Sequence, residues 1–105
     1  MLRSVGQQGR ATDGDEDVRV AGLRTAVSAL RRRLAALPAE FPDRVIAEDE
    51  LADLAEVIAH GVPDGARLRR SLLLLAGALG SVSALSDALT EVRHAVELFG
   101  EPRRS

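Results

Sequence analysis

A run of four consecutive leucines, Leu72–Leu75, constrains the fold of this chain more than any other feature. Small and apolar residues continue the run to Leu79, which is typical of a helix. Successive residues of an α-helix point about 100° apart, so four adjacent leucines reach all of its sides. A helix that is apolar all round must be covered all round. We therefore expect the rest of the chain, together with a second copy of it, to cover this helix.

Composition narrows the kind of protein further. The chain has 105 residues, 46% of them hydrophobic, which suits a single domain with a modest core. Aromatic residues make up only 2%, so the core must be aliphatic and stacking platforms for bases are lacking. With no cysteine there is no disulfide, thiolate nucleophile or Cys-ligated zinc. All 14 basic residues are arginine, so no P-loop lysine is available, and the net charge of −2 argues against a dedicated nucleic-acid binder.

The sequence favours a cytoplasmic location. No apolar run follows Arg3, so no signal peptide is evident. The apolar run 72–79 is about half of the ~20 residues that a membrane-spanning helix needs. Extending the run to Leu89 admits Asp87 and several serines. Absent cysteines also fit a reducing compartment. We expect no contact with a membrane.

The spacing of apolar residues predicts an all-α fold, a small bundle of three to four helices. The helices are expected at about 16–37, 47–60, 64–79 and 83–99, and the last two could be fused into one long helix, 64–99. The glycine-rich residues 1–15 are predicted to form a disordered N-terminal tail, 16–100 the single helical-bundle domain, and 101–105 a disordered C-terminal tail.

Three of the predicted helices carry rows of apolar residues spaced three and four apart. The rows are Val20, Leu23, Val27, Leu30, Leu34 and Leu37; Leu68, Leu72, Leu75, Leu79 and Val82; and Leu85, Leu89, Val92, Val96 and Phe99. The first row resembles a coiled-coil seam, but it is too short for one, which favours a bundle helix. Leu73 and Leu74 lie off the second row and create a second apolar face. The spacing slips between Val82 and Leu85, which favours a break there over a stammer in one helix.

The loop after the first helix contains Pro38 and Pro42, which end that helix. Phe41 lies between them and is one of only two aromatic residues. We expect Phe41 to plug the end of the bundle, although an exposed anchor for a partner is the alternative.

The next loop carries the clearest stop and start signals in the chain. Gly61 can adopt the positive φ that ends a helix, Val62 can make the accompanying apolar contact, and Pro63 prevents continuation. Asp64 is then expected to cap the third helix.

Charge is divided between the first two helices. From Arg19 to Arg33 the first has five arginines and no acidic residue, whereas the second is acidic and has no arginine from Val45 to His60. Helices joined by a short loop are usually antiparallel neighbours. The opposite charges favour this pairing, although each exposed ion pair contributes only ~0–1 kcal/mol.

Two His and Glu pairs have spacings found in functional sites. Glu91 and His94 match the Glu-x-x-His spacing of ferritin-like diiron helices. However, Val92 occupies the inward face of this helix, so His94 should face solvent. Glu56 and His60 are four residues apart, and a cation at the end of a helix explains His60. The sequence therefore assigns no catalytic, cofactor-binding or metal-binding residue, and it predicts no cofactor and no enzyme.

Two arginine clusters stand out, Arg31–Arg33 and the group of Arg67, Arg69 and Arg70. Both could bind phosphate groups. Each cluster also has a purely structural explanation. The cations of Arg31–Arg33 are favourable at the C-terminal end of a helix, and the long side chains of the second cluster can surround the leucines while their charged ends stay in water.

Three short strings resemble a family of small uncharacterised actinobacterial helical proteins with no assigned activity. They are AEFPD at 39–43, LRRSLLL at 68–74 and GSVSAL at 80–85, and the resemblance spans about 18–102. It implies no activity, and no functional residue transfers from it.

These observations favour a non-enzymatic, self-associating helical module for protein–protein interaction or regulation in an unknown pathway. A homo-oligomer, most simply a dimer, and an unknown protein partner are expected. The predicted interface consists of Leu68, Leu72, Leu73, Leu74, Leu75 and Leu79. The alternatives are a nucleic-acid-linked regulator that uses the arginine clusters and a bundle that binds a metal or small molecule through Glu91 and His94 or through Glu56 and His60.

Overall fold

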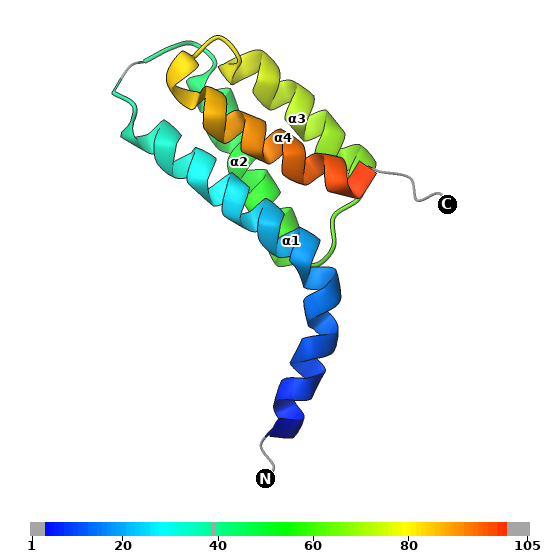
Figure 1. The fold of residues 1–105 in the computed structure, drawn as a ribbon. Helices are drawn as coiled ribbons and strands as arrows, with labels where there is room; N and C mark the ends of the chain where they lie inside the picture. The colour runs from blue at the N-terminus through cyan, green and yellow to red at the C-terminus, as the bar shows by residue number, and fades with distance from the viewer. Residues whose placement is uncertain (1–3, 39, 101–105) are drawn as a thin grey trace.

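The computed structural model describes residues 4–38 and 40–100, and it describes side chains over 18–38 and 40–99. Within these residues the fold consists of four α-helices and one 3₁₀ turn (Figure 1). The helices are α1 (Ser4–Ala36), α2 (Arg44–Ala59), α3 (Gly65–Leu79) and α4 (Ser86–Gly100), and the turn η1 (Ser83–Leu85) leads into α4. The predicted all-α bundle is confirmed.

The helices alternate in direction along the chain, so that each runs antiparallel to the next (Figure 1). α1 packs against α2 and α4, and α3 packs against the same two helices, which places α1 and α3 on a diagonal. The predicted antiparallel pairing of the first two helices is confirmed. The N-terminal part of α1 projects beyond the other helices (Figure 1).

The predicted helix ends lie closer to the observed ones in the C-terminal half of the chain than in the N-terminal half. α3 ends at Leu79 as predicted, and a turn separates it from η1, so the break is confirmed and the single helix over 64–99 is wrong. A side chain at Gly80 would clash with the carbonyl oxygen of Ala76, which makes glycine necessary at this turn.

The N-terminal half differs more. α2 begins at Arg44 rather than near Ala47, and α1 begins at Ser4 rather than near Glu16. Apolar spacing reveals only the part of a helix that packs against others, and the start of α1 lies beyond the bundle (Figure 1). Of the predicted N-terminal tail, 1–15, the structure describes residues 4–15, and they are helical. Whether this segment is disordered in solution stays a prediction. The predicted C-terminal tail, 101–105, lies outside the described residues.

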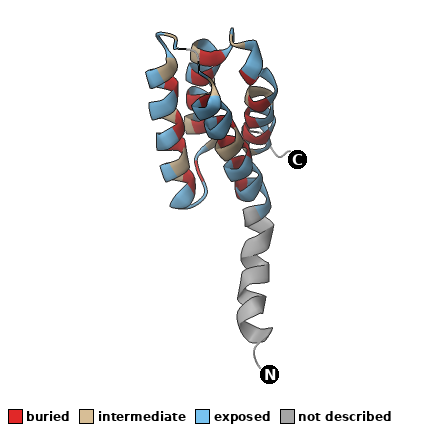
Figure 2. Cartoon of the chain, turned by 90° about the vertical axis from the view of Figure 1, so that its left-hand side faces the viewer, coloured by how far each residue is buried: buried red, intermediate tan, exposed pale blue. Residues whose placement is uncertain are grey.

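The predicted apolar rows form one aliphatic core, and the buried surfaces of the helices face one another (Figure 2). The largest side chains with almost no exposed surface include Leu23, Val27, Leu30, Leu34, Leu51, Leu54, Ile58, Leu68, Leu75, Leu79, Leu85 and Val92. Phe41 is half-buried and packs against this core, so its predicted place at the end of the bundle is confirmed.

The loop between α2 and α3 follows most of its predicted signals. Gly61 adopts a φ of +136°, which side chains disfavour, immediately after α2. The Asp64 carboxylate accepts a hydrogen bond of 3.2 Å from the backbone N–H of Arg67, so the predicted cap is confirmed. The apolar contact is different from the prediction, because Pro63 is buried while Val62 is exposed.

The loop between α1 and α2 is held by Arg44, whose role the sequence analysis missed. Its guanidinium donates hydrogen bonds to the carbonyl oxygens of Leu37 at 2.7 Å and Leu34 at 2.8 Å, and its Nε donates to the Glu48 carboxylate at 3.0 Å. The last carbonyls of a helix have no donors within that helix, and a cation is favourable there. Arg44, with a side chain only 12% exposed, therefore ties the end of α1 to the start of α2.

We expect the Arg44→Ala variant to lose about 2 kcal/mol of unfolding free energy, because hydrogen bonds to a charged group contribute about that much. Arg44→Lys should recover only part of the loss, since one ammonium cannot reproduce the planar fork. Urea unfolding followed by circular dichroism at 222 nm, at one fixed protein concentration, measures both. The control is Arg24→Ala, an exposed arginine of α1, and equal midpoints for Arg44→Ala and Arg24→Ala would contradict this role.

Candidate interaction surface

The six leucines of the predicted interface divide into two groups. Leu68, Leu75 and Leu79 are fully buried in the chain's own core, and Leu72 is half-buried. Leu73 is 72% exposed and Leu74 is 40% exposed. The reason is geometric, because α2 and α4 cover only part of the circumference of α3. The first group is therefore unavailable to a partner, and the available surface centres on Leu73 and Leu74.

A buried polar contact fixes which side of α3 faces inward. The hydroxyl of Ser71, which is only 2% exposed, donates a hydrogen bond to the carboxylate of Glu50 on α2. A buried hydroxyl without a partner is costly, so this contact favours one rotation of α3 about its axis. Sequence reasoning passed over Ser71, although its position three residues after Leu68 and four before Leu75 places it on the same side.

The exposed side of α3, called here the α3 outer face, combines leucines with small and basic residues. It consists of Arg69, Arg70, Leu73, Leu74, Ala76, Gly77 and Gly80, all of which are exposed. Beside it, a groove of about 230 Å³ separates α3 from α4. The groove is lined by Leu72, Leu73, Ala76, Gly80, Ser86, Leu89, Thr90 and Arg93. The α3 outer face and this groove form one continuous surface through Leu73, Ala76 and Gly80.

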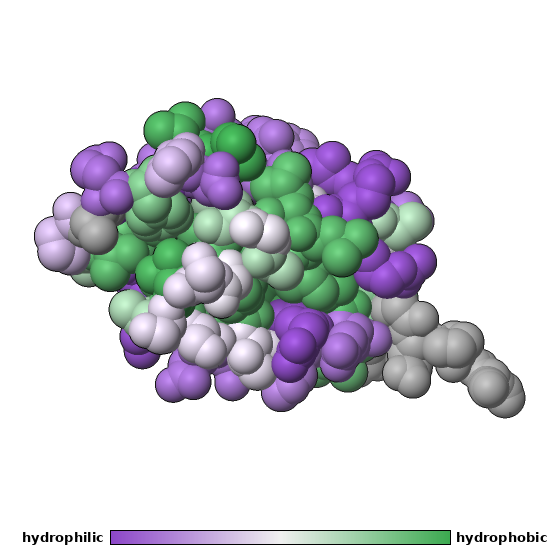
Figure 3. Space-filling model, turned by 90° about the horizontal axis from the view of Figure 1, so that it is seen from above, coloured by the Kyte–Doolittle hydropathy of each residue, from purple (hydrophilic) through white to green (hydrophobic). Residues whose placement is uncertain are grey.

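Exposed apolar surface is also visible in the space-filling view. The side of the molecule seen from above carries a band of hydrophobic residues bordered by hydrophilic ones (Figure 3). Single exposed apolar residues are normal on a protein surface, but contiguous apolar surface with a polar border is typical of interaction sites.

A second groove, of about 400 Å³, lies between α1 and α4. It is lined by Gly22, Thr25, Ala26, Ala29, Glu91, His94, Ala95 and Leu98. His94 is exposed as predicted, and so is Glu91. Over the part of the chain that the structure describes, no group of three or more His, Asp or Glu residues is placed to hold a metal ion.

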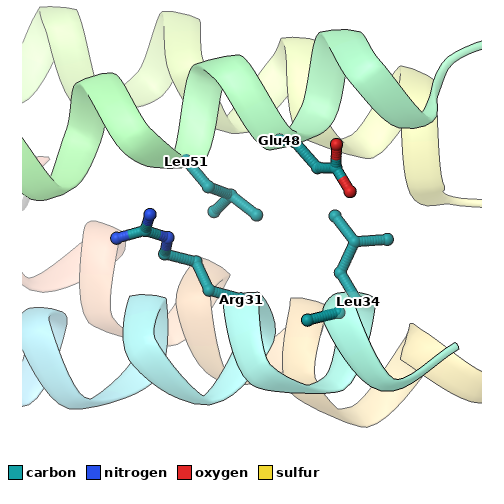
Figure 4. Close-up of a pocket in the computed structure, with 5 residues that line it drawn as sticks. Arg31, Leu34, Glu48 and Leu51 are labelled. Carbon is teal, nitrogen blue, oxygen red and sulfur yellow. The ribbon is translucent and has the colours of Figure 1, made fainter.

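The opposite charges of α1 and α2 form no ion pair across the two helices among the side chains that the structure describes. Arg31 and Glu48 line a pocket of about 230 Å³ between these helices, together with Leu34 and Leu51, but their charged groups extend in different directions (Figure 4). Among the described side chains, the ion pair found is Arg44 with Glu48, both in α2. Apolar packing and the Arg44 hydrogen bonds therefore join the two helices, and between the side chains described for α1 and α2 the predicted charge pairing of their faces contributes no ion pair.

Basic side chains instead donate hydrogen bonds to carbonyl oxygens at the C-terminal ends of helices. Arg19 donates a hydrogen bond of 3.5 Å to the Leu98 carbonyl at the end of α4, and its guanidinium lies 4.9 Å from the centre of the Phe99 ring. The Nδ1–H of His60 donates to the Glu56 carbonyl at 2.8 Å, at the end of α2. The predicted role of His60 is consistent with this contact, whereas the role of Arg19, like that of Arg44, was missed.

The two arginine clusters are not brought together into one site. Arg31–Arg33 are exposed at the end of α1, and Arg69 and Arg70 are exposed near the start of α3. Arg67 is half-buried, and its Nε is buried without a hydrogen-bond partner. α1 and α3 lie on the diagonal of the bundle, so the clusters belong to different sides of the molecule.

These features define a small antiparallel four-helix bundle with an exposed leucine face on α3. Residues 12–100 match the family model of DUF5955, a family of unknown function, so the chain belongs to this family. The predicted resemblance to a family without an assigned activity is confirmed, and the actinobacterial source stays a prediction. No curated protein and no solved structure gives a significant match. Among the described helices, none combines the length and apolarity needed to cross a membrane.

Alanine substitutions should separate the two groups of leucines. We expect Leu75→Ala to lose about 2–5 kcal/mol of unfolding free energy, because it leaves a cavity in the core. Leu73→Ala, its neighbour on the exposed side, should change the value by less than about 0.5 kcal/mol when unfolding is measured at a concentration at which the chain is monomeric. Thermal or urea unfolding measures both at one concentration, and similar losses for the two variants would contradict the observed orientation of α3.

Proposed function

We propose that this protein is a non-enzymatic helical module that associates with itself, as a dimer, through the α3 outer face. The observation that carries the proposal is the exposure of Leu73 and Leu74, side by side on one helix and continuous with the groove between α3 and α4. Burying one leucine side chain contributes about 1.5–3 kcal/mol, so covering both is a substantial driving force for association.

The rest of the surface supports binding more than chemistry. His94 and Glu91 line a groove without a third ligand among the described residues, and the side chain of Glu56 takes no part in the hydrogen bond of His60. Lysine and cysteine, two common nucleophiles, do not occur in the chain. In the proposed role the bundle presents a surface in the cytoplasm, and a further protein partner binds or is regulated there.

The dimer can be tested by size-exclusion chromatography with light scattering at micromolar concentrations. We expect a mass of twice the 11.2 kDa of one chain, falling to a single chain for Leu73→Glu, because the introduced charge would have to be buried. Concentration should be read by refractive index, since the chain has neither Trp nor Tyr.

The matched control is Leu98→Glu, because Leu98 is 56% exposed on the other groove, between α1 and α4. This variant should remain dimeric. A wild-type chain that stays monomeric across the concentration range would refute the proposal, and so would a Leu73→Glu variant that stays dimeric.

A further inference from the structure

We propose that the α3 outer face and the groove beside it bind an acidic amphipathic helix of another protein. This inference rests on the proposed role of the α3 outer face as an interaction surface, and it names a partner other than a second copy of this chain. Because the bound helix would cover Leu73, it competes with self-association and in this way regulates it.

The charge of this surface has one sign. The charged residues of the α3 outer face and of the groove lining are Arg69, Arg70 and Arg93, and all three are exposed. By contrast, the groove between α1 and α4 contains Glu91, and the pocket between α1 and α2 contains Glu48. The chain as a whole has a net charge of −2. A basic surface on such a chain attracts an acidic partner, whereas pairing it with an identical surface brings like charges together.

The three arginines are available to a partner, because no ion pair joins any of them to another described side chain. Glu97 lies four residues after Arg93 on the same side of α4, but the two form no ion pair. On the other flank of α3, the Glu50 carboxylate accepts its hydrogen bond from Ser71 and not from an arginine. A carboxylate supplied by a partner would therefore meet guanidinium groups that the described chain leaves unpaired, and such charge-assisted contacts are strong.

The apolar part of the surface fits a helix better than an extended peptide. Leu72, Leu73 and Leu89 line the groove beside the small residues Ala76 and Gly80. Strand addition needs the edge of a sheet, and polyproline recognition needs an aromatic groove. The described part of the chain has no strand, and the lining of this groove has no aromatic residue. A helix laid along the groove is the recurring recognition mode that remains.

The layout of the surface specifies what the partner helix carries. From residue 69 to residue 80 the α3 outer face extends about 16 Å, or about three helical turns. α3 and α4 run antiparallel, so Arg69 and Arg93 both lie toward the end of the groove where α3 begins (Figure 1). The expected partner therefore has apolar residues spaced three and four apart, which cover Leu73, and Asp or Glu beside them toward the arginine end.

The first test selects partners without assuming one sequence. The probe is a phage-displayed library of helical peptides of about 18 residues, or five turns, with leucine fixed on one face and Glu, Lys, Gln or Ser allowed on its flanks. The library is panned on the wild-type chain, and clones that also bind the Leu73→Glu variant are removed. We expect enrichment of Glu and depletion of Lys on the flanks. Enrichment of Lys, equal use of Glu and Lys, or no selected clone would overturn the proposal.

The second test measures the dissociation constant of one selected, fluorescently labelled peptide by anisotropy. Leu73→Ala should raise this constant about tenfold or more, because the burial of a leucine is lost. Arg93→Glu should raise it about threefold to tenfold, and replacing Glu by Lys in the peptide should restore binding to this variant. An unchanged constant for Arg93→Glu, or no recovery with the Lys peptide, would contradict the charge complementarity.

The matched controls lie on other surfaces of the molecule. Leu98→Ala changes an exposed leucine of the groove between α1 and α4, and Arg24→Glu reverses an exposed arginine of α1. Both should leave the dissociation constant of the peptide unchanged. A loss of affinity in either control equal to that of Leu73→Ala would place the peptide elsewhere and overturn the proposal.

Light scattering with the selected peptide separates this inference from the proposed dimer. A monomeric wild type that binds the peptide would refute the dimer and support the acidic partner. A dimeric wild type should dissociate into complexes of one chain and one peptide, and a dimer that binds the peptide without dissociating would overturn the competition. Sedimentation with phosphatidylglycerol vesicles that is lost in Leu73→Glu, without selection of acidic peptides, would assign the surface to an anionic membrane and overturn the proposal.

Discussion

Close packing of leucine, isoleucine and valine across the centre of the bundle is the interaction on which the rest of the structure depends. All of the large side chains with almost no exposed surface are of these three types. With only two aromatic residues, Phe41 and Phe99, both partly exposed, the chain has few large rings to fill irregular space, so its helices must approach closely and in a fixed rotation. The Ser71–Glu50 contact serves this requirement, because it determines which leucines of α3 enter the core.

Features that depend on neighbouring residues in the sequence were predictable. The apolar rows, the glycine with positive φ at Gly61, the cap at Asp64 and the break after Leu79 all follow from local spacing and backbone preference, and the structure contains each of them. The separation of Leu73 and Leu74 from the apolar row of α3 could also be read from the sequence. All six leucines were nevertheless predicted to form one interface, because apolar spacing alone does not distinguish a leucine buried within the chain from one that a second copy would cover.

Contacts between different elements were not predictable in the same way. Arg44 stands at the start of its own helix, where a cation is unfavourable, and its function concerns the carbonyl oxygens of Leu34 and Leu37. Arg19 likewise acts on the end of α4, which is 79 residues away in the sequence. The one available signal was the isolation of Arg44 ahead of an acidic helix that has no other arginine up to His60. An isolated cation in an unfavourable position indicates a partner outside its own helix.

The alternating order of the helices also bears on how the chain folds. The contacts of α1 with α2, α2 with α3, and α3 with α4 each join consecutive segments, so among the described elements the contacts of α1 with η1 and α4 are the ones that must close a loop containing most of the chain. Local contacts of this kind are associated with fast folding, whereas the entropy cost of closing a loop grows slowly with its length. Contacts between α1 and α4 offset this entropy cost. Small side chains such as Ala26 and Ala95 let the two helices approach closely, and Arg19 donates a hydrogen bond to the end of α4. The last helix is therefore the element whose docking completes the cooperative unit.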